Sequence, residues 1–325
     1  MTSNPFLPHS KFLLFPHLLL PFSTSPRLCA FARSSLQLKI PLQVRYALTI
    51  TLTLTACFGI QTLALHHVGG RTTKSESNFF SSIARIQNGL NSPSQIALLG
   101  SSRTGRLPDK ISLITQFPNV SNFGCDGATA AILLRAIDRG QIPPAETIII
   151  EGNTLVHDLD GKGQDMEKFL VSPWFKIGVV CRLLRADARP SAIAYSYLLN
   201  KKIGGFSDDD GTAALLLPAQ AKVVAATPDL PTEVKRAVAK MAAIINRLKY
   251  QNVRIMLVIL PPPTASESMN MSIPRALSHA ANIPMLDLAK DLPPGSVRYT
   301  DGVHMAPASA AAALRSILNA IKTLP

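Results

Sequence analysis

The stretch Ile96–Gly105, IALLGSSRTG, decides the fold that this sequence predicts. Four apolar residues run into Gly100 and two serines, and an arginine follows. This pattern is typical of a buried parallel strand that ends in a tight turn before a helix. Open α/β sheets bind ligands at the carboxyl ends of their strands, so a serine in this turn is a candidate for chemistry. A Gly-Ser-Ser turn is a weak signal by itself.

Beyond this turn, short apolar runs alternate with stretches of helical periodicity. Such alternation predicts an α/β fold, with a mostly parallel five-stranded sheet covered by helices on both faces. The predicted strands are Gln95–Gly100, Val120–Phe123, Thr147–Glu151, Arg254–Leu260 and Pro284–Leu288, and the predicted helices are Asn78–Leu90, Gly127–Arg139, Glu233–Tyr250 and Ala306–Lys322.

Composition and charge indicate a membrane segment rather than a nucleic-acid partner. The 325 residues carry a formal net charge of +13, with 47% hydrophobic and 16% charged residues. The mean hydropathy of +0.20 is high for a wholly soluble protein. No acidic residue precedes Glu76, so much of the positive charge lies in the N-terminal region and is a signal of topology. No basic helix with interleaved aromatic residues is present, and we expect no nucleic acid as partner.

One segment, Tyr46–Leu65, carries about 20 residues without a charge, which is enough to span a hydrocarbon core. Lys39 and Arg45 precede it and favour a cytoplasmic N-terminus, which places the rest of the chain outside the cytoplasm, on the periplasmic side. The alternative is a cleaved lipoprotein signal at Leu54–Cys57. Because the apolar run continues through Phe58–Ile60, an uncleaved signal anchor is favoured.

The chain is predicted to have four parts. They are a basic, Pro/Ser-rich segment at 1–45 without expected order, the anchor at 46–65, a linker with a lead-in helix at 66–93, and the α/β domain at 94–325. A helical insertion at about 155–230, with helices expected at Phe175–Leu184 and Ile193–Leu199, forms either a lid over a site or a solvated elaboration. Cys125 and Cys181 could pair or remain thiols. The cysteines form no metal-binding pattern, so no metal or other cofactor is expected.

Three further stretches end at the same edge of the predicted sheet: Asn122–Thr129, Gly152–Thr154 and Thr300–His304. A nucleophilic serine needs a base that accepts its proton, and His304 is a candidate for that base. Asp301 lies three residues before it, so one turn can hold its carboxylate against the imidazole. A structural histidine and an ordinary N-cap aspartate are the alternatives.

The same edge offers donors for an oxyanion. The backbone N–H groups of Ser102 and Gly127 and the side-chain amide of Asn153 are the candidates. Gly127 could instead be a turn glycine, and Asn153 a cap at the end of a strand. Arg103 is a candidate for binding an anionic substrate, with an exposed arginine in the first turn of a helix as the alternative.

In order and position, four blocks resemble those of the SGNH hydrolase superfamily, the GDSL-type esterases and lipases. They are Gly100–Ser102, Asn122–Gly127, Gly152-Asn153 and Asp301–His304, within about 94–324. The resemblance implies a flavodoxin-like three-layer α/β/α sandwich. It also implies the roles of the site residues. The expected catalytic triad is Ser102, Asp301 and His304. The expected oxyanion hole is formed by Ser102, Gly127 and Asn153.

The departures from the family pattern are informative. The Gly-Asp-Ser-Leu of the family reads Gly-Ser-Ser-Arg here, so Ser101 replaces an aspartate and is a rival nucleophile, although the register favours Ser102. Gly-Ser-Ser variants resemble the membrane-anchored, extracytoplasmic branches of the superfamily. That resemblance implies a membrane-tethered esterase or O-acyltransferase acting on an acylated, above all acetylated, cell-envelope or exopolysaccharide glycan. The alternative is a catalytically inactive component of an envelope assembly complex.

Overall fold

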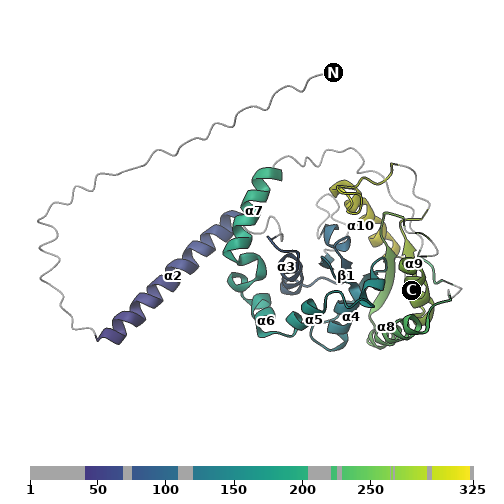
Figure 1. Cartoon of the computed structure of the whole chain (residues 1–325), viewed down its shortest axis with the longest axis horizontal. Helices are drawn as coiled ribbons and strands as arrows, with labels where there is room; N and C mark the ends of the chain where they lie inside the picture. The colour runs from purple at the N-terminus through teal and green to yellow at the C-terminus, as the bar shows by residue number, and fades with distance from the viewer. Residues whose placement is uncertain are drawn as a thin grey trace, which may run out of the picture. The chain divides into compact units, whose positions relative to one another are not determined.

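The computed structural model describes residues 41–68, 75–108, 120–203, 221–224, 229–263, 265, 268–290 and 295–322. The chain consists of two compact units, Met1–Thr55 and Ala56–Pro325, and the second contains the sheet (Figure 1). Most of the predicted N-terminal segment, residues 1–40, lies outside the described residues.

Five parallel strands form one sheet in the order β2-β1-β3-β4-β5. The strand that ends in Ser101 lies between β2 and β3, and all of its residues are buried. Burial on both faces is what an uninterrupted apolar run predicts. The strands are β1 (Ile96–Ser101), β2 (Val120–Cys125), β3 (Thr147–Glu151), β4 (Arg254–Ile259) and β5 (Met285–Asp287).

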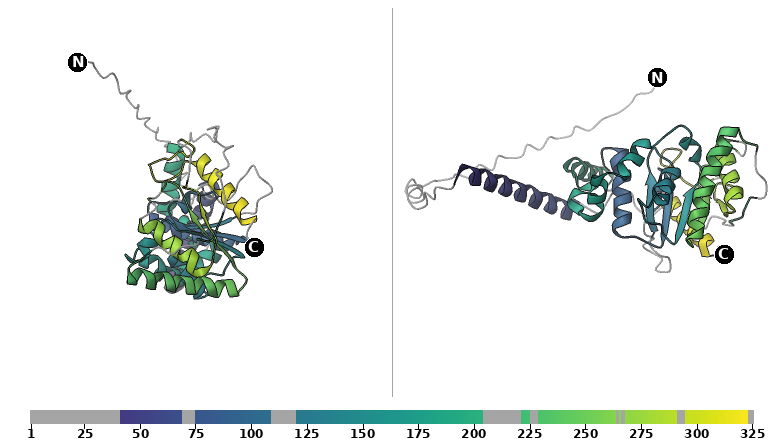
Figure 2. Two further views of the ribbon diagram at one scale, coloured as in Figure 1. Left: turned by 90° about the vertical axis from the view of Figure 1, so that its right-hand side faces the viewer. Right: turned by 90° about the horizontal axis from the view of Figure 1, so that it is seen from below.

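Helices cover both faces of the sheet, which confirms the predicted α/β fold. Ala97 and Leu99 of β1 belong to the core cluster formed with α3, α4, α8 and α9, whereas Ile96 and Leu98 pack in the cluster with α10. Figure 2 (left) shows α10 in yellow on one side of the sheet and the green helices α8 and α9 on the other. These helices are α3 (Asn78–Asn91), α4 (Ala130–Asp138), α8 (Thr232–Tyr250), α9 (Met269–Ala281) and α10 (Pro307–Lys322).

The N-terminal apolar segment is a helix, α2 (Leu42–Val68). An 18-residue window within Leu42–His67 has a mean hydropathy of 1.6, and the helix is long and apolar enough to cross a membrane. It begins within the segment at 1–45 for which no order was expected, so it is longer than the predicted span at 46–65.

The region predicted as a helical insertion contains more elements than the sequence indicated. The expected helix at Phe175–Leu184 is divided: an α-helix begins at Pro173 and ends at Val180, and a 3-10 turn follows. Ser172 caps the helix, because its hydroxyl accepts a hydrogen bond from the backbone N–H of Phe175. The elements are η2 (Leu155–Asp158), α5 (Gln164–Leu170), α6 (Pro173–Val180), η3 (Arg182–Leu184), η4 (Ala186–Ala188) and α7 (Pro190–Ile203).

Two differences from the sequence prediction bear on the site. The helix expected from Gly127 begins only at Ala130, because Gly127 has a φ of +75° and Thr129 accepts a hydrogen bond from Ala131 as the N-cap. The sequence analysis assigned no helix between the fourth and fifth strands, where α9 lies. Pro274 is inside that helix and obscures its pattern.

We predict that Gly124 tolerates no side chain. A Cβ at this position would collide with the backbone nitrogen of Gly105, which cannot rotate away. Gly124→Ala should lower the free energy of unfolding by more than about 3 kcal/mol, measured by denaturation of the full-length protein in detergent. Gly140→Ala is the control, since its φ is +69° but nothing lies near the added Cβ. It should cost only about 1 kcal/mol, and equal losses would contradict the close approach.

Candidate active site

At the end of β1, two neighbouring serines have different partners: Ser101 binds Glu151 in the interior, and Ser102 contacts His304. Ser101, the last residue of the strand, is 5% exposed, and its hydroxyl donates to Glu151 at 2.8 Å. The same hydroxyl accepts a hydrogen bond from the backbone N–H of Arg103 at 3.2 Å. Ser102 is half-buried and its Oγ lies 2.9 Å from Nε2 of His304. The rival serine is thus engaged in the interior, and Ser102 is the one that meets the histidine.

Glu151, at the end of β3, holds this turn through hydrogen bonds to its carboxylate. Its side chain is fully buried, and its carboxylate oxygens accept hydrogen bonds from the backbone N–H and hydroxyl of Ser101. They also accept from the hydroxyl of Thr104 at 2.6 Å and its backbone N–H at 3.3 Å. The hydroxyl of Thr154 donates to Oε1 of Glu151 at 3.4 Å. A buried carboxylate is tolerated only with such a set of donors, so the turn and the carboxylate require each other.

Gly100 makes room for that carboxylate. In the β1–β3 register, Leu99 pairs with Ile150, which places Gly100 beside Glu151. A Cβ on Gly100 would collide with the Glu151 carboxylate and with the Thr104 hydroxyl. The glycine of the Gly-Ser-Ser turn is therefore required by the side chain of the neighbouring strand.

The other neighbour of β1 holds the far end of the same turn. The buried Asn122 of β2 donates its side-chain amide to the carbonyls of Thr104 and Leu107, at 2.8 and 2.7 Å. Thr104 is the first residue of η1 (Thr104–Arg106), and Leu107 is the residue that caps its end. Arg85 of α3 donates to the Gly124 carbonyl and lies 3.6 Å from Asp126, which fixes the end of β2. The Ser101–Leu107 turn is thus tied to both adjacent strands.

His304 is presented by a short closed loop before α10. The backbone N–H of Thr300 donates to the His304 carbonyl at 2.9 Å, and Tyr299 bridges Met305. Met305 is 4% exposed and anchors the loop in the core cluster on the α10 face. Gly302, with a φ of +79°, allows the reversal of the chain.

Asp301, His304 and Ser102 form one hydrogen-bonded chain. Oδ2 of Asp301 lies 2.6 Å from Nδ1 of His304, and Oδ1 accepts from the His304 backbone N–H at 2.8 Å. Because a carboxylate only accepts, Nδ1 carries the proton and Nε2 is left to accept from the Ser102 hydroxyl. The hydrogen bonds from the side chain and backbone of His304 hold the pKa of Asp301 well below its usual range, so this carboxylate is charged at neutral pH.

The predicted oxyanion donors lie at the carboxyl ends of three adjacent strands. The backbone N–H groups of Ser102 and Gly127 donate to no acceptor among the described residues. The amide of Asn153 is buried and fixed: Nδ2 donates to the Leu260 carbonyl at 2.9 Å, and Oδ1 accepts from the Leu260 N–H at 2.7 Å. One Nδ2 hydrogen remains for another acceptor, so its role as an oxyanion donor stays a prediction.

Arg103, the neighbour of Ser102, carries an unsatisfied donor. Its Nη1 is buried and has no hydrogen-bond partner among the residues that the structure describes. Burial raises the pKa of Tyr299, and the positive charge of Arg103 opposes part of that rise. The role of Arg103 in binding an anionic group stays a prediction.

Cys125, near the end of β2, does not offer a thiolate. Cys125 and Cys181 are free thiols, the first buried and the second half-buried. Burial raises the pKa of Cys125 to about 12, so that its thiol stays protonated. In the described residues, no group of three or more His, Cys, Asp or Glu side chains could hold a metal ion.

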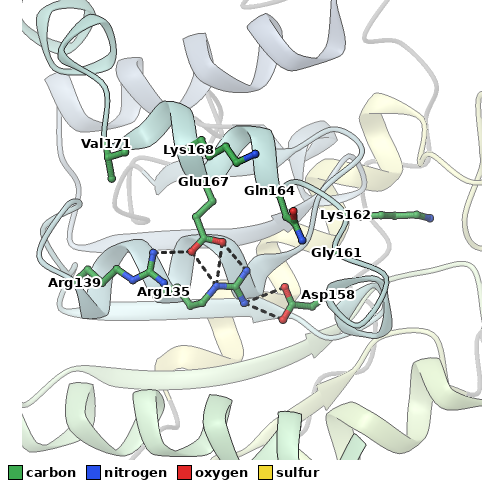
Figure 3. Close-up of a pocket in the computed structure, with 9 residues that line it drawn as sticks. All are labelled: Arg135, Arg139, Asp158, Gly161, Lys162, Gln164, Glu167, Lys168 and Val171. Atoms are coloured by element: carbon green, nitrogen blue, oxygen red, sulfur yellow. Dashed lines mark hydrogen bonds and ion pairs between the residues drawn. The ribbon is translucent and has the colours of Figure 1, made fainter. Parts of the chain in front are cut away.

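One cavity of the described residues lies away from the triad. It has a volume of about 540 Å³, and ion pairs join Arg135 to Asp158 and Glu167 within it (Figure 3). Ser102, Asp301 and His304 are not among the described residues that line it. A smaller hollow of about 320 Å³ borders the predicted oxyanion residue Gly127; it is also lined by Phe79, Asp126, Ala128, Gly161, Gly163, Gln164, Asp165 and Met166.

Comparisons of the chain with protein-family models, with curated proteins and with solved structures find no match. The SGNH resemblance therefore remains a prediction from the four sequence blocks. The fold and the hydrogen bonds of the site are independent of it.

Glu151 is the residue of the site that the sequence analysis missed. We predict that Glu151→Gln, which keeps the shape but turns an amide NH₂ toward hydrogen-bond donors, lowers the free energy of unfolding by about 1–3 kcal/mol. It should also slow the reaction of the protein with a fluorophosphonate, because Ser102 is no longer held against His304.

Thr154→Val is the matched control, since it removes only the contact at 3.4 Å from the same carboxylate. It should change both quantities little, by less than about 0.5 kcal/mol in stability. If Glu151→Gln and Thr154→Val behave alike, the carboxylate does not position the turn.

Proposed function

We propose that this protein is a serine esterase or O-acyltransferase. The observation that carries the proposal is the position of His304 between Asp301 and Ser102, at 2.6 and 2.9 Å. An imidazole that is oriented by a carboxylate and contacts a serine hydroxyl can remove the proton of that serine. The two-sided fixation of the turn supports the proposal, because it holds the hydroxyl ready for attack.

The first half-reaction forms an acyl-enzyme. Ser102 Oγ attacks the carbonyl carbon of an ester while Nε2 of His304 takes the hydroxyl proton. The carbonyl oxygen becomes an oxyanion facing the N–H groups of Ser102 and Gly127 and the free Nδ2 hydrogen of Asn153. When the C–O bond to the leaving alcohol breaks, His304 returns its proton to that alcohol.

The second half-reaction passes the acyl group on. Water, or a sugar hydroxyl, gives its proton to His304 and attacks the acyl carbon, and the Ser102 ester bond breaks with return of the proton to Oγ. With water the protein is an esterase, and with a sugar hydroxyl it is an O-acyltransferase. Asp301 stabilises the imidazolium that forms in each step.

We place the reaction at a membrane surface outside the cytoplasm. α2 is long and apolar enough to cross a membrane, and the basic residues Lys39 and Arg45 at its N-terminal side favour a cytoplasmic N-terminus. The substrate class that fits this location and the Gly-Ser-Ser motif is an acylated, above all acetylated, cell-envelope or exopolysaccharide glycan. Partners from an envelope-assembly complex belong to the same proposal.

Two features of the site suggest how such a substrate is held. The half-buried Arg103, next to Ser102 in the chain, supplies a positive charge that suits a carboxylate or phosphate on a glycan. The hollow beside Gly127 combines the ring of Phe79 with the polar groups of Asp126 and Gln164. An aromatic ring and hydrogen-bonding side chains of this kind suit a sugar.

We predict that the full-length protein in detergent releases acetate from an aryl acetate and from acetylated polysaccharide. Ser102→Ala should lower the rate by at least about 10³-fold, because the nucleophile is lost. Ser101→Ala should retain acyl-enzyme formation at a reduced rate, since this serine only supports the turn.

Equal rates for wild type and Ser102→Ala would exclude the catalytic proposal. They would favour the alternative, a catalytically inactive component of an assembly complex. Loss of activity in Ser101→Ala with retention in Ser102→Ala would assign the nucleophile to the other serine.

A further inference from the structure

The helical region between β3 and α8 exposes a row of large apolar side chains. On α6, Trp174 is 68% exposed, Ile177 40% and Val180 83%, and Leu184 of the adjoining η3 is 47% exposed. The three α6 residues recur every third position, which places them along one side of the helix. Such a contiguous exposed apolar surface calls for a partner.

The opposite side of α6 is fixed to the body of the protein. Phe175 is 2% exposed, and its carbonyl accepts a hydrogen bond from Gln87 of α3 at 3.0 Å. Gly178 lies so close to the Gln87 amide that a side chain there would collide with it. The exposed row is therefore held in one orientation and is not the surface of a loose helix.

This row is continuous with the C-terminal part of α2. Gln61 of α2 donates its side-chain amide to the carbonyl of Leu183 at 2.8 Å and to that of Ala188 at 2.7 Å. Leu65, one turn later, is only 5% exposed. All of these residues belong to the compact unit Ala56–Pro325. Gln61 lies near the C-terminal end of the segment Leu42–His67 that can cross a membrane. The backbone of Leu183, which Gln61 contacts, therefore lies beside the last turns of α2.

We propose that α6 and η3 are a second membrane contact, in which Trp174, Ile177, Val180 and Leu184 enter the interfacial layer of the bilayer where α2 leaves it. The proposal rests on the insertion of α2 that the proposed function includes. Tryptophan is favoured at that depth, because its ring is apolar and its N–H can reach water.

The charges on the same surface agree with a lipid partner. Lys176 of α6 and Arg182 of η3 are both exposed, and cations beside an apolar row are typical of helices that lie in an interface with anionic headgroups. Because this surface adjoins α2, a bilayer crossed by α2 would lie against it directly. A second protein would have to enter between this surface and the membrane. The contact would hold the catalytic domain close to the membrane surface.

The chain contains a single tryptophan, so its fluorescence reports on Trp174 alone. We would reconstitute the full-length protein in vesicles of phosphatidylcholine with phosphatidylglycerol that carry a doxyl quencher either near the headgroup or at the end of the acyl chain. The expected result is blue-shifted emission that is lost mainly to the shallow quencher and is protected from aqueous iodide.

Val180→Asp should increase the quenching of Trp174 fluorescence by iodide and decrease its quenching by the doxyl lipids. The variant should still float with the vesicles in a density gradient, because α2 remains inserted. Tyr250→Asp, an equally exposed apolar position on α8, is the matched control and should change nothing. Emission that iodide quenches and neither doxyl lipid quenches overturns the proposal. Emission that neither iodide nor the lipids quench also overturns it, because protein rather than lipid would then cover Trp174. Failure of the wild type to float overturns both the anchor and this contact.

Discussion

The arrangement of the site depends on one buried carboxylate. Glu151 ends β3 in the interior of the protein, where a charged group is costly unless donors surround it. The donors come from Ser101 and Thr104, so the chain after β1 must fold into the turn that brings both residues to the carboxylate. Gly100 follows from the same constraint, since any side chain there would occupy the space of the carboxylate.

This constraint decides which serine is available for reaction. Glu151 holds the Ser101 hydroxyl in the interior, whereas Ser102 lies after the end of β1, on the half-buried side of the turn. His304 approaches from that side, on a loop that is anchored by Met305. The carboxylate that holds the turn comes from the neighbouring strand β3.

The sequence allowed the sheet and the meeting of distant residues to be predicted, because buried parallel strands read as apolar runs and their carboxyl ends share one edge. Ser102, Asp301 and His304 could be brought together by that rule alone. The role of Glu151 could not be predicted, because it is simply the last residue of an apolar strand and the burial of a single glutamate leaves no periodic signal. The helix α9 was missed for another local reason, the proline inside it. Long-range contacts such as Gln61 to Leu183 have no counterpart in a sequence pattern.

The most direct test of this account is to identify the serine that reacts. The full-length protein would be treated with a fluorophosphonate and digested with trypsin, which releases Ile86–Arg103 with both serines of the turn. Fragmentation of this peptide in a mass spectrometer separates an adduct on Ser102 from one on Ser101. The account predicts the adduct on Ser102 alone, and an adduct on Ser101, or an unmodified peptide, would contradict it.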